Sequence, residues 1–323
     1  MGKESLRTEI ESNKFTFNIS LSEKIFTIGS CFSDVIGGKL SQFKFKVLSN
    51  PFGTTYNPIS IFKLLTEDVI DEEKIIQNQG LYFHYDFHSS FRHLDKNALV
   101  ELLNKLKFKS INHLKESNCL IITLGTAWVY ELVSSCKVVN NCHKVPQKEF
   151  NKRLLRMKEM ATEMDDAIEY LKQINPDLQI IMTVSPVRHT KEGLKENQLS
   201  KSMLRVLCDF AETSYKNVHY FPSYEIMIDD LRDYRFYKDD LIHPTHFAEQ
   251  YIWEKFQTTF FAKETMDFIQ DWKLIINAMD HKPFNSETEE HQNFLKSQIQ
   301  KLKLLSNRTD VEDEMLFFES QLV

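Results

Sequence analysis

Three short apolar runs, separated by much longer segments, constrain the fold most strongly. They read KIFTI at 24–28, CLIITL at 119–124 and LQIIMTV at 178–184, and five of the six residues of the middle run are apolar. Runs this short and this apolar are typical of parallel strands that are covered on both faces, because neither face then needs polar residues. We therefore predict a three-layer α/β domain in which these three strands are parallel.

The segments between these runs supply the remaining elements. FKVL at 45–48 and VHYF at 218–221 predict two further strands. Apolar residues at helical spacing predict the covering helices, and Pro176 blocks the continuation of the helix before it. The helices are expected at 32–42, from 59 to about 65, 96–107, 150–174, 199–215 and 244–261, the last opening at Pro244.

The character of the chain changes after residue 262. No strand signal remains, and two helical stretches at about 264–278 and 287–305 are separated by the polar sequence HKPFNSET. We divide the chain into an α/β domain, 1–262, and a helical C-terminal extension, 263–323. Two interpretations of the extension stay open: it packs over the edge of the domain, or its helical hairpin makes a homodimer.

Charge and cysteine pattern exclude several classes of function. Forty Lys and Arg against 46 Asp and Glu give a net charge of −6, which counts against nucleic-acid binding. No window approaches 18 uninterrupted apolar residues, and the N-terminal MGKESLRTEIESNK is too polar for a secretory signal. The five cysteines are irregularly spaced without a CxxC pair, which favours reduced thiols in the cytoplasm and no metal or other cofactor.

Polar residues follow the first strand in the order Gly29–Ser30–Cys31–Phe32, directly before a helix. Ligands of open α/β sheets gather at the carboxyl ends of the strands. A nucleophile at this place would lie at a helix N-terminus, where backbone N–H groups favour a thiolate or an oxyanion. The plainer interpretation is that Ser30 caps the helix and Cys31 is a small buried residue.

A carboxylate and an imidazole lie three residues apart in Asp240–Leu241–Ile242–His243. This spacing lets Asp240 orient His243 and stabilise its charged form, as a base that activates a nucleophile requires. A surface turn with a helix-capping Asp is the alternative. Gly125, which follows the most apolar strand, allows substrate to approach the backbone closely.

The order of these motifs resembles the SGNH/GDSL hydrolases, and more closely the GSCFA family. The resemblance covers roughly residues 7 to 262 and implies a flavodoxin-like, SGNH hydrolase-like parallel sheet. It rests on the stretches IGSCFSD (28–34), NPFGTTYNP (50–58), ITLGTAWVY (122–130), NNCHKVP (140–146), TVSPVRH (183–189), YFPSYEIMIDDLRDYRFY (220–237) and DDLIHPTHF (239–247).

The resemblance places Cys31 at the nucleophile position, and a shift by one residue places Ser30 there instead. Both registers stay open, and Cys31 is favoured because a thiol needs less activation than a hydroxyl. Ala127 stands where the SGNH superfamily has the oxyanion-binding Asn. Asn57, Thr126 and Asn141 are the candidates to donate a hydrogen bond to the oxyanion in place of that Asn. Gly53 and Gly125 match the glycines that the resemblance implies in the two loops.

Arg188 and His189 follow the strand at 178–184 and should lie near the same edge of the sheet. They either bind a substrate carboxylate or phosphate or pair with the acidic residues of DDLRDYR. The resemblance as a whole implies a hydrolase or acyltransferase that acts on a small-molecule ester, such as a carbohydrate O-acyl group, without a cofactor. The alternative, suggested by Ala127, is a catalytically idle SGNH-like ligand-binding protein.

Overall fold

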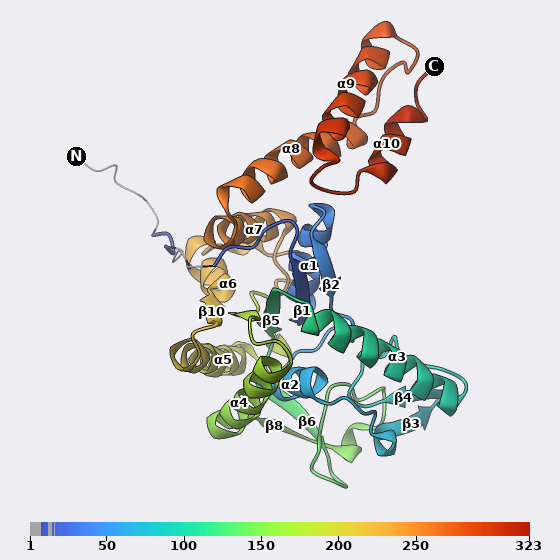
Figure 1. Cartoon of the computed structure of the whole chain (residues 1–323). Coiled ribbons are helices and arrows are strands. Elements are labelled where there is room, and N and C mark those ends of the chain that lie inside the picture. Colours follow the sequence, from blue (N-terminus) through green and yellow to red (C-terminus); the bar gives the residue numbers. More distant parts are fainter. Residues whose placement is uncertain (1–7, 12–14, 16) are drawn as a thin grey trace, which may run out of the picture.

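The computed structural model describes residues 8–11, 15 and 17–323, so most of the polar N-terminal segment lies outside the described residues (Figure 1). Its central sheet has five parallel strands in the order β10-β9-β5-β1-β2. The predicted α/β fold class is confirmed. The strands are β1 (Lys24–Gly29), β2 (Lys46–Ser49), β5 (Cys119–Leu124), β9 (Gln179–Val184) and β10 (Val218–Phe221).

The strand order reverses between β1 and β5. From β1 the chain first adds β2 on one side and then returns to build β5, β9 and β10 on the other side. The register aligns the ends of the two central strands, since Gly29 pairs with Thr123. Such a switch point leaves a crevice at the carboxyl ends of the strands, which is where open α/β sheets bind ligands.

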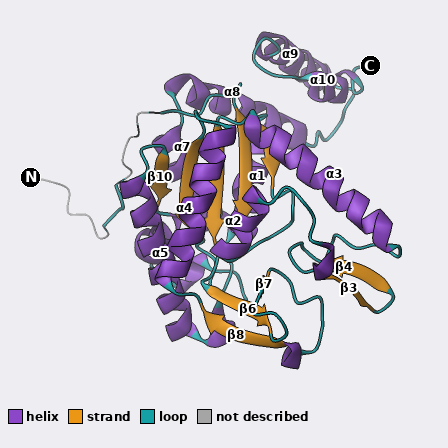
Figure 2. Ribbon diagram, turned by 60° about the horizontal axis from the view of Figure 1, so that its bottom comes forward, coloured by secondary structure: helices purple, strands orange, loops and turns teal. Residues whose placement is uncertain are grey.

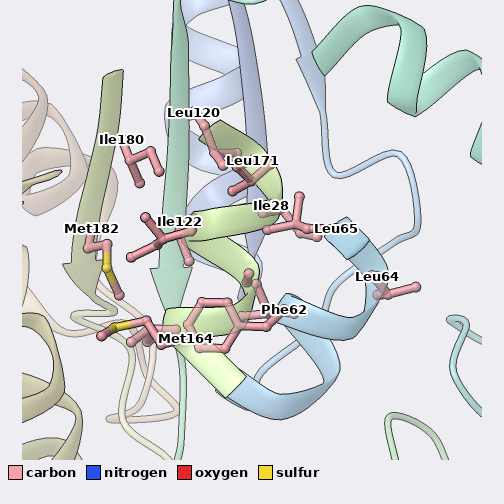
Figure 3. Close-up of a cluster of buried hydrophobic side chains, with 14 of the residues drawn as sticks. Ile28, Phe62, Leu64, Leu65, Leu120, Ile122, Met164, Leu171, Ile180 and Met182 are labelled. Carbon is pink, nitrogen blue, oxygen red and sulfur yellow. The ribbon is translucent and has the colours of Figure 1, made fainter. Parts of the chain in front are cut away.

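Alternate residues of each strand enter two separate cores, because side chains of a strand point to opposite faces. Ile28, Ile122 and Met182 lie against helices on one face, with Phe62 and Met164 beside them (Figure 3). Those helices are α2 (Pro58–Thr66), α3 (Lys96–Lys115), α4 (Met157–Ile174) and α5 (Leu194–Ser214). Ile25, Ile121 and Ile181 face α1 (Cys31–Gln42) and α7 (His246–Phe260), so the domain has three layers (Figure 2).

Two small antiparallel sheets are attached to this framework. They are β3 (Ile75–Asn78) with β4 (Leu81–His84), and β6 (Trp128–Leu132) between β7 (Val138–Val139) and β8 (Phe150–Leu154). The prediction of a helix from residue 150 was wrong for residues 150–156, because residues 150–154 pair with β6 and α4 begins at Met157. The remaining short helices are α6 (Ser223–Glu225), η1 (Glu72–Lys74), η2 (Gln147–Glu149), η3 (Thr190–Glu192), η4 (Ile226–Asp230) and η5 (Tyr234–Phe236).

The start of α7 also differs from the prediction. Pro244 does not open the helix; it pairs with Tyr237 in an isolated bridge. Thr245 is the N-cap, and its Oγ1 accepts a hydrogen bond from the N–H of Ala248 at 3.3 Å. A hydroxyl at the N-cap satisfies one of the first N–H groups of the helix, which have no partner within it.

Beyond residue 262 the chain forms α8 (Lys263–Asp280), α9 (Glu289–Leu305) and α10 (Glu312–Glu319), and this part contains no strand. Helix α8 leaves the domain next to α7, while α9 and α10 lie side by side farther out (Figure 1). Trp272 is buried and donates from Nε1 to the carbonyl oxygen of Gln42 at 3.0 Å, which ties α8 to α1. The boundary at 262 and the homodimer stay predictions. Among the described helices, none has the length and apolar character to cross a membrane.

Candidate active site

A cavity of about 480 Å³ lies at the switch point of the sheet. It receives residues that follow β1, β5 and β9, and residues from the segment before α7. Of the predicted site residues it brings together Ser30, Cys31, Gly125, Arg188, His189 and His243, and it is completed by Tyr56, Ser185, Val187, Thr190, Lys191 and Ile242. Five segments far apart in the sequence therefore meet in one place.

Gly29 sets the position of the nucleophile candidates. Its φ is 144°, and a Cβ at this position would lie 2.2 Å from the carbonyl oxygen of Thr123. The N–H of Ser30 donates to that same oxygen at 3.0 Å. The N–H of Gly29 donates to Oδ1 of Asn50 at 2.8 Å, and Nδ2 of Asn50 donates to Oδ1 of Asp34 at 2.7 Å. The end of β1 is thus held from β5 and from the loop after β2.

Ser30 and Cys31 have different exposure although they are neighbours. Ser30 is the N-cap residue of α1, but its side chain makes no capping hydrogen bond, and its buried Oγ has no partner among the described residues. Cys31 is the first residue of the helix and is half-buried. The cavity therefore gives a substrate better access to the thiol than to the hydroxyl.

Burial raises the pKa of the Cys31 thiol above its usual range. The carboxylate of Asp34 acts in the same direction, whereas the ammonium of Lys201 and the N–H groups of Cys31 and Phe32 act against it. The N–H groups at the start of the helix favour the thiolate, as the sequence indicates, but they do not decide the direction of the shift. Loss of solvent outweighs the helix N-terminus here because a thiolate is poorly stabilised away from water.

Asp240 and His243 are in direct contact. Nδ1 of His243 lies 2.7 Å from Oδ2 of Asp240, and Oδ1 of Asp240 accepts from the N–H groups of Ile242 and His243 at 2.8 and 2.9 Å. The N–H and imidazole of His243, with the N–H of Ile242, hold the pKa of Asp240 well below its usual range. Because an ionised carboxylate accepts hydrogen bonds, Nδ1 carries the proton and Nε2 is left as the basic nitrogen.

Arg188 holds the loop that carries this pair. Its N–H donates to the carbonyl oxygen of Ile242 and its guanidinium donates to that of Leu241, both at 3.2 Å. The guanidinium also lies 3.9 Å from the centre of the Tyr237 ring. The acidic residues of DDLRDYR, which the sequence offered as partners, pair instead with Arg232, Lys255 and Arg235.

His189 lines the cavity as a neutral imidazole. Burial lowers its pKa to about 4, and the positive charges of Lys201, Lys152 and Lys191 act in the same direction. Its Nε2 lies 3.4 Å from a carboxylate oxygen of Glu192, which also pairs with Lys152. At neutral pH His189 is therefore a polar neutral group rather than a cation for substrate anions.

Three of the residues proposed as oxyanion donors lie outside the cavity lining and make local hydrogen bonds. The N–H of Gly53 donates to the carbonyl oxygen of Asn50 at 2.8 Å, closing a tight turn. Asn57 caps α2, since its Oδ1 accepts from the N–H of Ser60 at 2.9 Å. Oδ1 of Asn141 accepts from the N–H of His143 at 2.9 Å. Local turns and a helix cap explain these polar residues, and none of the three lines the cavity.

Gly125 lines the cavity, but its N–H is already used. The carbonyl oxygen of Tyr56 accepts from the N–H groups of Gly125 and Thr126 at 2.7 and 3.0 Å. Oγ1 of Thr126 lies 3.1 Å from Oγ of Ser200, which also accepts from the N–H of Ala127 at 2.7 Å. The loop after β5 thus directs these donors into the protein, and a role of Thr126 as an oxyanion donor stays a prediction.

Lys201 is a site residue that the sequence analysis missed. It lies on α5, is buried, and donates from Nζ to the carbonyl oxygens of Gly125 and Ser185 at 2.8 and 2.7 Å. The available signal was its position on the buried stripe of α5, four residues after Asn197 and three before Leu204. A lysine on such a stripe is rare unless it has a specific partner.

Comparison with protein families identifies the chain. A model of the GSCFA family matches residues 24–256, and a model of the C-terminal domain of GSCFA domain proteins matches residues 272–323. The chain belongs to the GSCFA family. A search of curated protein sequences gives no match.

Solved structures that resemble this GSCFA protein do so at low similarity. A Clostridium thermocellum family 3 carbohydrate esterase has 9% identity and a TM-score of 0.36, covering 77% of this chain and 98% of that chain. A family 3 carbohydrate esterase from Talaromyces cellulolyticus has 10% identity and a TM-score of 0.34, and the match covers 78% of this chain and 98% of that chain. An acetyl xylan esterase from Butyrivibrio proteoclasticus has 11% identity and a TM-score of 0.36, and the match covers 74% of this chain and 63% of that chain.

Among the residues that the structure describes, no group of three or more His, Cys, Asp or Glu side chains is arranged to hold a metal ion. His84 and His143, for example, each direct Nε2 at a backbone carbonyl oxygen, of Asp71 and of His84. These imidazoles are part of the packing around β4.

Proposed function

We propose that this GSCFA protein cleaves or transfers the acyl group of a small ester through Cys31, with His243 as the base and Asp240 orienting it. One observation carries the proposal: the cavity at the switch point is lined by both Cys31, at the start of α1, and His243, whose imidazole is hydrogen-bonded to Asp240. Nucleophile, base and orienting carboxylate are the set that acyl transfer requires.

In the proposed reaction, Sγ of Cys31 attacks the ester carbonyl carbon while its proton moves to Nε2 of His243. The C–O bond of the ester then breaks, and the leaving alcohol takes the proton from the imidazolium. Water or an acceptor hydroxyl attacks the resulting thioester with His243 again as the base, which releases the acid or the new ester and restores the thiol. Because the pKa of Cys31 is raised, the thiol rests protonated and needs this base.

The N–H groups of Cys31 and Phe32 are the donors that we propose for the oxyanion. They belong to the first turn of α1, where N–H groups have no partner within the helix. Among the described residues, those that line the cavity include no Asn or Gln, so none of them replaces the amide donor of the SGNH pattern with another amide. Loss of one such donor costs on the order of a hundredfold in rate, and we expect a slow enzyme.

A small ester is the substrate class that we propose, with carbohydrate O-acyl groups as the first candidates. The volume of about 480 Å³ is in the usual range for small-molecule sites. Tyr56 adds an aromatic ring to the lining and is 39% exposed, so a ligand can reach it. The family's resemblance to the SGNH hydrolases is what favours carbohydrate esters.

The test is hydrolysis of 4-nitrophenyl acetate and of acetylated sugars by the wild type and four variants. Cys31→Ala should abolish turnover, His243→Asn should lower it by about 10²–10⁴-fold, and Ser30→Ala should leave it measurable. Cys142→Ala is the matched control, because Cys142 is also half-buried but lies outside the cavity lining. If activity survives Cys31→Ala but is lost in Ser30→Ala, Ser30 is the nucleophile and Cys31 is not. If neither substitution changes the activity, the proposed nucleophilic mechanism is wrong.

A ligand-binding protein without turnover is the second candidate. It is favoured by the loop after β5, in which Ala127 is fully buried and its N–H bonds to Ser200 instead of facing the cavity. Calorimetric binding of an acetylated sugar by the wild type, without any release of acetate over hours, would select this function. Release of acetate that depends on His243 would exclude it.

A further inference from the structure

The lining of the cavity has a charge pattern of its own. It includes the cationic side chains of Arg188 and Lys191, and the described residues that line it include no Asp or Glu. The whole chain has the opposite balance, with 46 acidic residues against 40 basic ones. A recess that carries cations attracts anions, because its walls exclude water and concentrate the electric field.

The ammonium of Lys191 is held at the cavity by a hydroxyl. Its Nζ donates to Oη of Tyr130 at 2.9 Å and lies 5.3 Å from the centre of the same ring. Among the described residues, Lys191 forms no ion pair with a carboxylate. An ammonium has three N–H donors, so the bond to Tyr130 orients the group and leaves donors for a ligand.

Two carboxylates lie close to lining residues but have partners of their own. Glu192 follows Lys191 in the chain, and its side chain pairs with Lys152. Asp240 accepts hydrogen bonds from the N–H and the imidazole of His243. Neither carboxylate lines the cavity. The positive charge of Lys191 is therefore not cancelled by its immediate neighbours.

Arg188 is less accessible to a ligand than Lys191. Its guanidinium donates to the carbonyl oxygen of Leu241 and stacks on the ring of Tyr237, and these contacts hold it against its own loop. Lys191 is exposed and can turn towards a ligand. One accessible ammonium balances one negative charge, which is the charge of a carboxylate, whereas a phosphate monoester carries nearly two at neutral pH.

We infer that Lys191 determines substrate specificity: it selects esters that carry a carboxylate on their acyl or alcohol part, and it pairs with that carboxylate while the ester carbonyl lies at Cys31. This substrate class rests on the proposed function, whereas the attraction of anions rests on the cavity alone. The gain is that of one exposed ion pair, so the preference for an anionic ligand over a matched neutral one should be about two- to fivefold.

Alkylation of Cys31 measures the attraction of anions without any ester. Iodoacetate carries a carboxylate, iodoacetamide is its neutral counterpart, and both react with the thiolate, so the ratio of their rates does not depend on the thiolate fraction. Peptide mass spectrometry on the full chain at pH 8 gives both rates, with the exposed Cys136 as internal reference. Relative to Cys136, Cys31 should favour iodoacetate about two- to fivefold at low ionic strength, and less in about 0.5 M NaCl.

Two substitutions separate the charge of Lys191 from its shape. Lys191→Gln removes the charge and should lower the rate ratio at Cys31 by about two- to fivefold, and Lys191→Glu reverses the charge and should lower it further. Lys195→Glu is the matched control, because the side chain of Lys195 is 95% exposed and lies outside the cavity lining. It changes the net charge as much as Lys191→Glu does and should keep the wild-type ratio.

The second measurement uses two esters that differ by one negative charge, 4-acetoxybenzoate and its methyl ester. In Lys191→Gln, kcat/KM for the anionic ester relative to the neutral one should fall about two- to fivefold, through KM, because an ion pair away from the reacting atoms contributes equally to binding of substrate and transition state. Lys195→Glu should keep the wild-type selectivity.

The outcomes separate this inference from the proposed function. A rate ratio at Cys31 that is the same in the wild type, Lys191→Gln and Lys191→Glu would overturn the inference, whether or not esters are cleaved. A Cys31 that neither reagent reaches, while Cys136 reacts, would overturn it as well. If no ester is cleaved but the ratio follows the charge at position 191, the attraction of anions stands and the proposed reaction is wrong.

Discussion

The two sides of the candidate site are built in different ways. The side that we call the helix wall is the segment Gly29, Ser30 and Cys31, whose last two residues line the cavity; Ser30 is 2% exposed and the backbone is held from β5 and from Asn50. The side that we call the loop wall is formed by Arg188 and His243, which line the cavity, and by Asp240 behind His243; the side chains of Asp240 and His243 are 45% and 44% exposed. The helix wall depends on the packing of the sheet, whereas the loop wall depends on a few polar contacts.

This difference implies that stability and activity are separable within one site. A change in the helix wall disturbs a backbone that is packed between strands, so the free energy of unfolding should fall. A change in the loop wall leaves the packed strands intact and alters the orientation of the base, so activity should fall instead. Four predictions test or sharpen this division.

The largest effect is expected for Gly29→Ala in the helix wall. The new Cβ would lie 2.2 Å from a backbone oxygen at a φ of 144°, so both overlap and strain destabilise the fold, by about 3 kcal/mol or more. Urea denaturation measures this. Gly38→Ala in α1 is the control, because nothing lies within 4 Å of its new Cβ; it should be neutral or stabilising by about 0.5–1 kcal/mol. Equal stability of the two variants would contradict a rigid helix wall.

The free energy of unfolding should depend on pH because of the buried Lys201. The pKa of Lys201 is lowered from 10.5 to about 7 in the folded state, so between these pH values the unfolded chain binds one more proton. The free energy of unfolding therefore rises with pH in this window. Between pH 7 and 8.5 the wild type should gain about 1–2 kcal/mol relative to Lys201→Gln. A difference between the two proteins that does not vary with pH would show that Lys201 titrates normally.

Arg188→Gln tests the loop wall. Without the guanidinium, the loop loses a hydrogen bond to Leu241 and the stacking on Tyr237, so His243 should be less well oriented. We expect kcat/KM for ester hydrolysis to fall about tenfold, which is about 1.4 kcal/mol, with the melting temperature nearly unchanged. Arg232→Gln, an exposed arginine paired with Asp229, serves as the control. A large loss of stability without a change in kcat/KM would reverse the assignment of this wall.

The smallest effect is expected for Asn57→Ala, which separates a helix cap from an oxyanion donor. Loss of the bond to Ser60 should destabilise the protein by about 1 kcal/mol, as is typical of N-caps. Ester hydrolysis, compared at a temperature well below the melting point, should not change. If hydrolysis falls by a factor of ten or more while stability is kept, Asn57 takes part in catalysis.

Much of the framework could be predicted from the sequence. The apolar runs at 24–28, 119–124 and 178–184 became central parallel strands because burial on both faces leaves a clear local pattern. The small sheet of β6, β7 and β8 could not be recognised in the same way. Residues 150–154 carry enough apolar residues to continue a helix, and their strand conformation depends on pairing with 128–132.

The sequence by itself determined the parts of the site that are local. Asp240 and His243 are three residues apart, so the chain between them suffices to bring carboxylate and imidazole together. Tertiary structure alone decided the rest: Lys201 meets the carbonyl oxygen of Gly125 from 76 residues away, and burial raises the pKa of Cys31 although a helix N-terminus should lower it. The physical reason is that desolvation depends on everything packed around a group, whereas a turn depends only on its own few residues.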